Sequence, residues 1–194
     1  MTIKRDLLLK RIIDAKHNDF VKIITGIRRC GKSYLLFKLF KQHLIKNGVK
    51  KDHIIEVDLE NTSFKALQNP IELLAYVKNK IKKDGRWNYV LIDEIQNCQK
   101  VLPLGTDLSR IHPDDRENAY VTFYSVLSEL RTMHHVDVYI TGSNAYLLSG
   151  ELATLLSGRF IEIKMLPLSF KEYLSAFTEN QDRATQFRRF IQFG

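Results

Sequence analysis

Long apolar runs and cysteines are scarce in this sequence. No stretch approaches the roughly 18 to 20 uncharged apolar residues that a membrane-spanning helix requires. The amino terminus, MTIKRDLLLKRIIDAK, interrupts its leucines with charge too often for a signal peptide. The two cysteines, Cys30 and Cys98, are too few for a disulfide framework, so we expect reduced thiols. These absences favour a cytoplasmic protein that makes no contact with a membrane.

Familiar metal-binding and hydrolase patterns are missing as well. H-E-x-x-H does not occur, and His134 and His135 form no metal-binding pattern with the cysteines. No Ser-His-Asp arrangement is legible, since such triads are assembled in space. Internal repeats and low-complexity tracts are also absent from the sequence. These side chains therefore give no candidate metal centre.

What is present fits one globular domain over residues 1–194, with 44% hydrophobic and 27% charged residues. The net charge of +8 is uneven: residues 1–51 hold 14 Lys or Arg against 3 Asp, or +11, and residues 52–194 hold 16 against 19 acids, or −3. Clustered Lys and Arg attract phosphate. The basic part therefore predicts a nucleotide partner, with a nucleic-acid surface as the alternative.

Short apolar runs alternate with helical patterns along the chain. We predict strands at 21–25, 54–59, 89–94, 136–143 and 159–165. Helices are predicted at 3–15, 33–47, 70–83, 119–133, from Ser169, and at 182–192. This alternation predicts an α/β fold with a mainly parallel five-stranded sheet, covered on both faces, and a site at the carboxyl ends of its strands.

Three segments stand apart from that core. Residues 1–20 form a helical amino-terminal segment. Residues 100–118 contain prolines, a glycine and acids, and are predicted to be an insertion or lid loop. Residues 169–194 are predicted to form carboxyl-terminal helices.

GIRRCGKS, residues 26–33, lies between a strand pattern and a helix pattern. Gly26, Gly31, Lys32 and Ser33 fit G-x-x-x-x-G-K-[ST], the signature of a loop that wraps polyphosphate. Backbone N–H groups and the positive end of the helix favour phosphate there, Lys32 would reach the β and γ phosphates, and the Ser33 hydroxyl would ligate Mg²⁺. The predicted nucleotide-binding residues are Gly26, Ile27, Arg28, Arg29, Cys30, Gly31, Lys32, Ser33 and Tyr34.

Acidic residues end the third predicted strand, VLIDE. Asp93 is placed to hold Mg²⁺ together with Ser33. Glu94, the next residue, is placed to activate water against the γ phosphate by accepting its proton or by orienting it. The alternative is that the two acids only cap a strand with solvated charge.

Two further polar residues are candidates for catalysis. The fourth strand ends in TGSN, so Asn144, with Ser143 as second choice, could hold the attacking water. Arg159 begins the fifth strand, and its guanidinium could stabilise transition-state charge in its own chain or in a neighbour. A turn for TGSN and a structural ion pair for Arg159 are the alternatives.

Five stretches together resemble prokaryotic AAA-type ATPases related to the archaeal ATPase and signal-transduction NTPase branches: GIRRCGKS, YVLIDEIQ, VYITGSNAYLLS, LLSGRF and MLPLSFKEYL. The resemblance covers about residues 20–174. It implies a three-layer P-loop sandwich with the sensor strand between the strands of the two nucleotide motifs. It also implies the roles given above for Lys32, Ser33, Asp93, Glu94 and Asn144. Gly158-Arg159 matches a Gly-Arg pair that recurs in that group.

The sequence departs from the resemblance in two places. Similar proteins continue into a winged-helix-like segment and a nuclease-like domain, so residues 169–194 are expected to be cut short. The segment at 100–118 is also longer than the corresponding connection in similar proteins.

The leading hypothesis is an ATP-binding, Mg²⁺-dependent ATPase core that couples nucleotide state to conformational change. The alternative is a nucleotide-gated binding module for nucleic acid or protein with little turnover. Phosphotransfer to a small molecule is disfavoured, because adjacent Asp and Glu favour water as the acceptor. A GTPase is disfavoured because no N-K-x-D occurs, since Asn79-Lys80-Ile81-Lys82 lacks the final acid. The oligomeric state stays open.

Overall fold

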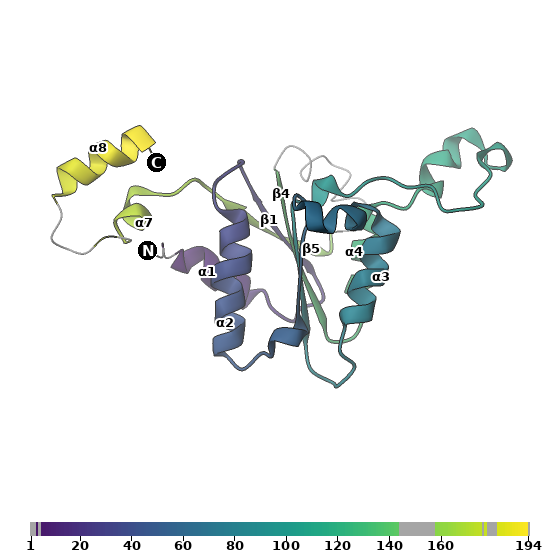
Figure 1. Cartoon of the computed structure of the whole chain (residues 1–194), viewed down its shortest axis with the longest axis horizontal. Coiled ribbons are helices and arrows are strands. Elements are labelled where there is room, and N and C mark those ends of the chain that lie inside the picture. The colour runs from purple at the N-terminus through teal and green to yellow at the C-terminus, as the bar shows by residue number, and fades with distance from the viewer. Residues whose placement is uncertain (1–2, 4, 144–157, 176, 178–181, 194) are drawn as a thin grey trace.

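A single parallel sheet of five strands forms the centre of the molecule (Figure 1). The computed structural model describes residues 3, 5–143, 158–175, 177 and 182–193. In spatial order the strands are β2 (Ile54–Asp58), β3 (Asn88–Asp93), β4 (Val136–Ser143), β1 (Val21–Gly26) and β5 (Phe160–Met165). The predicted five-stranded α/β sheet is confirmed, and so is the predicted place of the fourth strand between the first and third.

Helices cover both faces of this sheet, which gives the three layers expected of a parallel sheet (Figure 1). One face carries α1 (Asp6–Asp14) and the continuous helix formed by η1 (Tyr34–Phe40, π-helical) and α2 (Lys41–Lys46). The other face carries α3 (Pro70–Lys80) and α4 (Phe123–Arg131). Short 3₁₀ turns fill the connections: η2 (Lys51–His53), η3 (Thr62–Gln68), η4 (Ile95–Asn97), η5 (Leu108–Arg110) and η6 (Pro113–Ala119).

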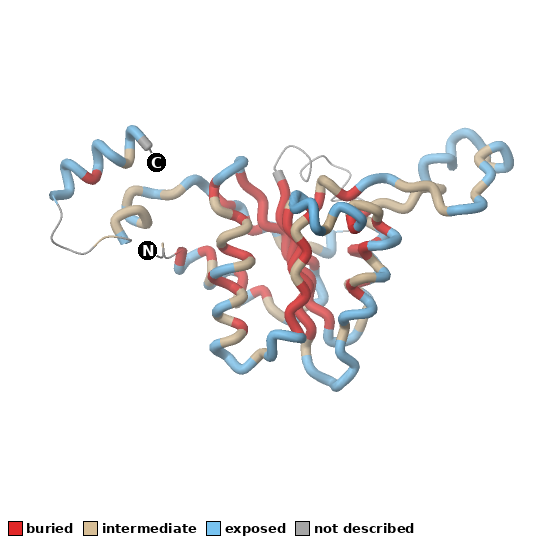
Figure 2. The backbone as a smooth tube through the Cα atoms, viewed as in Figure 1, coloured by how far each residue is buried: buried red, intermediate tan, exposed pale blue. Residues whose placement is uncertain are grey.

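The strands β1 and β3 are buried along their whole length, as the red tube in Figure 2 shows, whereas β5 at the side of the sheet is buried only at Ile163 and Met165. Successive strand residues face opposite layers, so Ile92 and Ile140 pack toward α3 and α4, whereas Leu91 and Tyr139 pack toward α1 and η1. Full burial of each such side chain contributes about 1.5–3 kcal/mol. This two-sided core explains why the strands are continuous apolar runs rather than alternating patterns.

Helix ends differ from the predicted ones where local hydrogen bonds intervene. The helix predicted at 119–133 is shorter, because Thr122 and Ser125 form a capping box that starts α4 at Phe123. The helix predicted to run to residue 83 stops at Lys80. The Asn88 side chain bonds both the N–H and the carbonyl of Lys82, which holds the chain in a turn toward β3.

Two segments extend away from the sheet on opposite sides (Figure 1). The segment at 100–118 leaves as an arm whose base is closed by an antiparallel bridge between Val101 and Val121, and Lys100 lies over the ring of Tyr120. The arm points outward, away from the phosphate loop candidate. On the other side lie α7 (Phe170–Leu174) and α8 (Arg183–Phe193), joined to each other by aromatic contacts of Phe170. Within the described part of the chain, no helix has both the length and the apolar character needed to cross a membrane.

Candidate functional site

Apart from Arg159, the predicted site residues that the structure describes lie at the carboxyl edge of the sheet. Gly26, the last residue of β1, pairs in register with Ser143 of β4, and Asp58 at the end of β2 pairs with Asp93 at the end of β3. All strands are parallel, so these ends lie along one edge. The phosphate loop candidate leaves the sheet at this edge and returns as the helix η1.

Glycine is required at two positions of the loop. A Cβ atom on Gly26 would lie 2.6 Å from the carbonyl oxygen of Met165 and 2.8 Å from Cys30 Sγ, closer than any side chain tolerates. Gly31 has φ +94°, a conformation open to glycine. Arg29 has φ +65°, which strains a residue that has a Cβ atom. The loop is therefore a tight backbone turn held against β5.

Lys32 is buried inside this loop, with 4% of its surface exposed. Its ammonium group donates to the carbonyl oxygens of Gly26 and Ile27, both at 3.2 Å, and lies 3.9 Å from Glu94 Oε1. Three donors on a flexible stem suit an anion that arrives at the same place. The lysine is thus already aimed at the concave side of its own loop.

Asp93 is buried at the end of β3, and burial raises the pKa of its carboxyl group. Hydrogen bonds from Ser33 and Thr141 lower this pKa in part, whereas the negative charges of Glu94 and Asp58 raise it further. The Asp93 carboxylate, the two hydroxyls and the neighbouring acids together offer hard oxygen ligands and an excess of negative charge, which a divalent cation would offset. Ser33 and Asp93 therefore fit a divalent cation such as Mg²⁺ by their chemistry and placement.

Glu94 lies next to Asp93 but faces a different environment. Its backbone is left-handed, with φ 51°, and its N–H donates to Thr141 Oγ1 at 3.1 Å. The Gln96 amide donates to Glu94 Oε2. The side chain lines a hollow of about 260 Å³ together with Arg28, Lys32, Glu60, Gln96 and Asn97. Glu94 can therefore be reached from solvent, as a group that acts on water must be.

Thr141 and Gln96 are site residues that the sequence analysis missed. Thr141 Oγ1 donates to Asp93 Oδ1 and accepts from the backbone of Glu94, so one hydroxyl orients both acids. A polar residue inside the apolar strand VDVYIT, next to the strand that carries Asp93, is the sequence signal for it. Gln96 follows the acids by two residues in DEIQ, and nothing in its position alone distinguishes it from a surface glutamine.

The other predicted residues differ in where they lie. Arg28 and Tyr34 belong to the loop and the first turn of the helix, and Arg28 is exposed and forms an ion pair with Glu60 at 3.2 Å. Asn144 lies outside the described residues, so its predicted role stays a prediction. Ser143 ends β4 beside Gly26.

Arg159 lies at the opposite edge of the sheet. Its carbonyl accepts from the N–H of Val21, the first residue of β1, and it precedes β5. Register pairs Val21 with Phe160 and Gly26 with Met165, so the strand length, roughly 20 Å, separates Arg159 from the loop. This place is far from a nucleotide bound at its own loop, and the predicted role of Arg159 stays a prediction. The alternative, that it serves a neighbouring chain, is compatible with its exposed position.

Comparison with known proteins gives a family match over most of the chain. Residues 18–174 match the family described as AAA domain. An uncharacterised protein of Haemophilus influenzae is 36% identical over 174 residues, which are 90% of this chain and 38% of that protein. An uncharacterised protein of Methanocaldococcus jannaschii is 27% identical over 207 residues, covering 99% of this chain and 38% of that one. The chain thus spans 38% of the length of these two relatives.

A solved structure supports the fold. The structure of PCH-2 of C. elegans superposes with a TM-score of 0.52 at 16% identity, covering 87% of this chain and 41% of that one. At this identity the likeness concerns the arrangement of strands and helices alone.

Proposed function

This chain belongs to the AAA domain family, and from that premise we propose that it binds ATP with Mg²⁺ and hydrolyses the terminal phosphate. Family and fold make it a nucleotide-binding, ATPase-like module. The observation that carries the proposal is that the buried Lys32 and Glu94 line one hollow of about 260 Å³ and lie 3.9 Å apart, with the buried Asp93 directly before Glu94 at the end of β3.

The loop residues would bind the phosphates. Backbone N–H groups of the turn Ile27–Gly31 and the positive end of the helix that follows attract an anion. Lys32 would exchange its bonds to the carbonyls of Gly26 and Ile27 for phosphate oxygens, a small movement because the ammonium group already lies in the loop. Ser33 and Asp93 would hold Mg²⁺, which supplies positive charge to offset that of the phosphates.

Glu94 would act on the attacking water. Its carboxylate lines the hollow and lies 3.9 Å from Lys32, so it would reach a water held beside a bound γ phosphate. Gln96 donates to Glu94 Oε2, and the Thr141 hydroxyl accepts from the backbone N–H of Glu94. Glu94 Oε1 would then accept a proton from the water or orient it. Asn144 is proposed as a second group that holds this water.

A second candidate function is a nucleotide-gated binding module for nucleic acid or protein. The outward arm at 100–118 and the helices α7 and α8 favour it, since both extend from the core and offer surface to a partner. In either case we place the protein in the cytoplasm, where the free thiols of Cys30 and Cys98 stay reduced.

Phosphate release from purified protein with ATP and Mg²⁺ tests the proposal, with ATP affinity measured in parallel. We expect Lys32→Ala to weaken ATP binding by about 100-fold or more, and Glu94→Gln to keep binding while losing about 10²–10⁴-fold in turnover. Lys41→Ala is the matched control, because Lys41 is a lysine of the same helix paired with Glu56 at 2.5 Å, away from the loop.

Three outcomes distinguish the proposed ATPase from the binding module. Equal ATP affinity in wild type and Lys32→Ala would show that this loop does not bind the nucleotide. ATP binding without phosphate release in the wild type would favour the binding module. Titration of labelled DNA at two salt concentrations, with and without ATP, then tests its nucleic-acid version, because phosphate contacts weaken steeply with salt.

A further inference from the structure

The strongest unexplained feature outside the nucleotide site is a buried arginine, Arg5. It lies just before α1, with 5% of its surface exposed, and Arg is almost never buried unless its donors are paired. Its guanidinium makes three hydrogen bonds to three distant parts of the chain: Nε donates to Glu172 Oε1 at 2.9 Å, Nη1 to the Cys30 carbonyl at 3.1 Å, and Nη2 to the Leu166 carbonyl at 3.0 Å.

One of these bonds acts on the phosphate loop. The Cys30 carbonyl belongs to the same peptide unit as the N–H of Gly31, and in a planar trans peptide these two groups point in opposite directions. Arg5 holds the carbonyl on its own side, so the Gly31 N–H points away from Arg5. Gly31 and Arg29 on either side both have positive φ, so this peptide has an unusual orientation that needs a partner to hold it.

A second bond acts on the carboxyl-terminal helices. Glu172 Oε1 accepts from Arg5, and Glu172 Oε2 accepts from the backbone N–H and hydroxyl of Ser169, which completes the capping box of α7. Burial would raise the pKa of Glu172, but the bonds from Ser169 and Arg5 outweigh it and lower the pKa. The carboxylate therefore stays charged and bridges the cap of α7 to Arg5.

We propose that Arg5 is a positioning residue that couples the phosphate loop to α7 and α8. Through Cys30 it sets the peptide that presents the Gly31 N–H to phosphate, and through Glu172 and Leu166 it holds α7 against the core. α8 follows α7, because the ring of Phe170 packs on Phe187 and Phe190 and Tyr173 donates to Gln186. The inference rests on the proposed binding of ATP at the loop.

Coupling of this kind is reciprocal. If the loop is ordered by phosphate, the Cys30 carbonyl holds Arg5 more firmly and α7 is docked more firmly. If α7 is released, the loop loses part of its orientation and binds ATP less well by the same factor.

The test compares two carboxamide variants that each break one ion pair. Glu172→Gln weakens the link of Arg5 to α7, and the matched control Glu56→Gln breaks the pair with Lys41 on another part of the sheet. Arg5→Lys is the second variant, because a lysine keeps the charge but cannot bond three acceptors in a fork. ATP affinity is measured for all three, together with amide hydrogen exchange of α7 and α8 with and without Mg²⁺ and ATP.

We expect Glu172→Gln and Arg5→Lys to weaken ATP binding about 10-fold, within the usual range of coupling between sites, and Glu56→Gln to bind as wild type does. ATP should slow exchange in α7 and α8 of the wild type, and this slowing should be lost in Glu172→Gln. Wild-type affinity in both Arg5→Lys and Glu172→Gln, or an ATP response in α7 that survives in Glu172→Gln, overturns the coupling and leaves the proposed ATP site intact. Failure of the wild type to bind ATP overturns the proposed function, and the coupling with it.

Discussion

At the amino edge of the sheet Asp137 faces the ammonium group of Lys22, whereas at the carboxyl edge Asp93 faces two hydroxyl groups and two further acids. Both carboxylates are buried, with 2% and 3% of their surfaces exposed, and they lie on neighbouring strands. Among the residues that the structure describes, Asp137 therefore has a paired cation and Asp93 does not.

The amino edge is a completed polar network. Asp137 accepts hydrogen bonds from the Lys22 ammonium group, from the Tyr139 hydroxyl at 2.8 Å and from the backbone N–H of His17 at 3.1 Å. Burial lowers the pKa of Lys22, and Asp137 beside it acts in the opposite direction. His17 reaches the Tyr89 hydroxyl at 2.9 Å, and burial raises the pKa of Tyr89 to about 12. A network in which each member has a partner fixes the strands that carry it.

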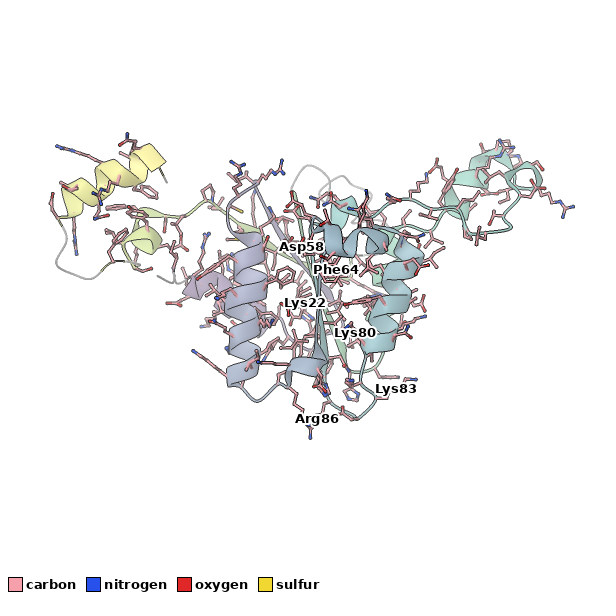
Figure 3. All side chains as sticks on the ribbon, in the orientation of Figure 1. Lys22, Asp58, Phe64, Lys80, Lys83 and Arg86 are labelled. Atoms are coloured by element: carbon pink, nitrogen blue, oxygen red, sulfur yellow. The ribbon has the colours of Figure 1, made fainter. Side chains whose placement is uncertain are left out.

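The two edges also differ in how the cations near them are placed. In Figure 3, Lys83 and Arg86 lie at the turn of the amino edge, Lys22 lies inside against the sheet, and Asp58 lies toward the other end. At the carboxyl edge Lys32 lies 3.9 Å from Glu94, but among the described residues no cation forms an ion pair with the buried carboxylate of Asp93. A cation bound there would offset the cost of burying that charge. Asp137 is thus neutralised by a lysine of the core, whereas in the proposed function Asp93 would be neutralised by a bound cation.

The largest expected effect comes from breaking the structural pair. Asp137→Asn removes the counter-ion of a fully buried lysine, and breaking a buried pair costs about 3–5 kcal/mol. Chemical denaturation should show this loss, and heating should show a midpoint lower by roughly 10 °C. ATP affinity, measured below that midpoint, should stay within about 3-fold of wild type.

The double variant Lys22→Met with Asp137→Asn is the control, because it removes both charges. It should recover a large part of the loss. If Asp137→Asn alone unfolds no more easily than wild type, the amino edge is not the structural network described above.

An effect of opposite sign is expected at the carboxyl edge. The pKa of Asp93 is raised in the folded chain, so the folded state binds its proton more readily than the unfolded state does. Stability linked to Asp93 is therefore present below its unfolded pKa and is lost as the pH rises through its folded pKa. Asp93→Asn removes the charge, and we expect the nucleotide-free chain to gain roughly 1 kcal/mol at pH 7 while it loses hydrolysis.

Denaturation at several pH values checks this prediction. The gain of Asp93→Asn over wild type should shrink as the pH falls through the raised pKa of Asp93, because the wild-type carboxyl is then protonated too, and it should be gone below the ordinary aspartate range. A loss of stability at pH 7 would contradict the view that Asp93 is kept charged at a cost.

Sequence reasoning predicted the five-stranded sheet, the place of its fourth strand between the first and third, and a site at the carboxyl edge, but not the places of β2 and β5. Apolar runs, the glycines and lysine of the loop, and acids directly after a strand each carry their signal within a few residues. Parallel pairing then brings Gly26, Asp58, Asp93 and Ser143 to one edge.

The contacts that reasoning missed depend on distance in space. Arg5 meets Glu172 across 167 positions, and Lys22 meets Asp137 across 115, so no local pattern indicates either. The place of Arg159 also depends on the arrangement in space. A residue at the start of a parallel strand lies at the opposite edge from the residues that follow strand ends, and strand direction decides which edge it joins.

The smallest expected effect concerns Arg159, which lies at the amino edge of the sheet. Its side chain is exposed, so Arg159→Ala should change the free energy of unfolding by less than about 0.5 kcal/mol. In dilute protein, turnover should also be unchanged, because the strand length separates this residue from its own loop. If copies of the chain assemble, an arginine at the amino edge can face the carboxyl edge of a neighbour, and the variant should then lose turnover only as protein concentration rises. Phosphate release per chain, measured over a dilution series, distinguishes these cases. A loss of turnover that is equal at every concentration would mean that Arg159 acts within its own chain, contrary to what its place in the sheet leads us to expect.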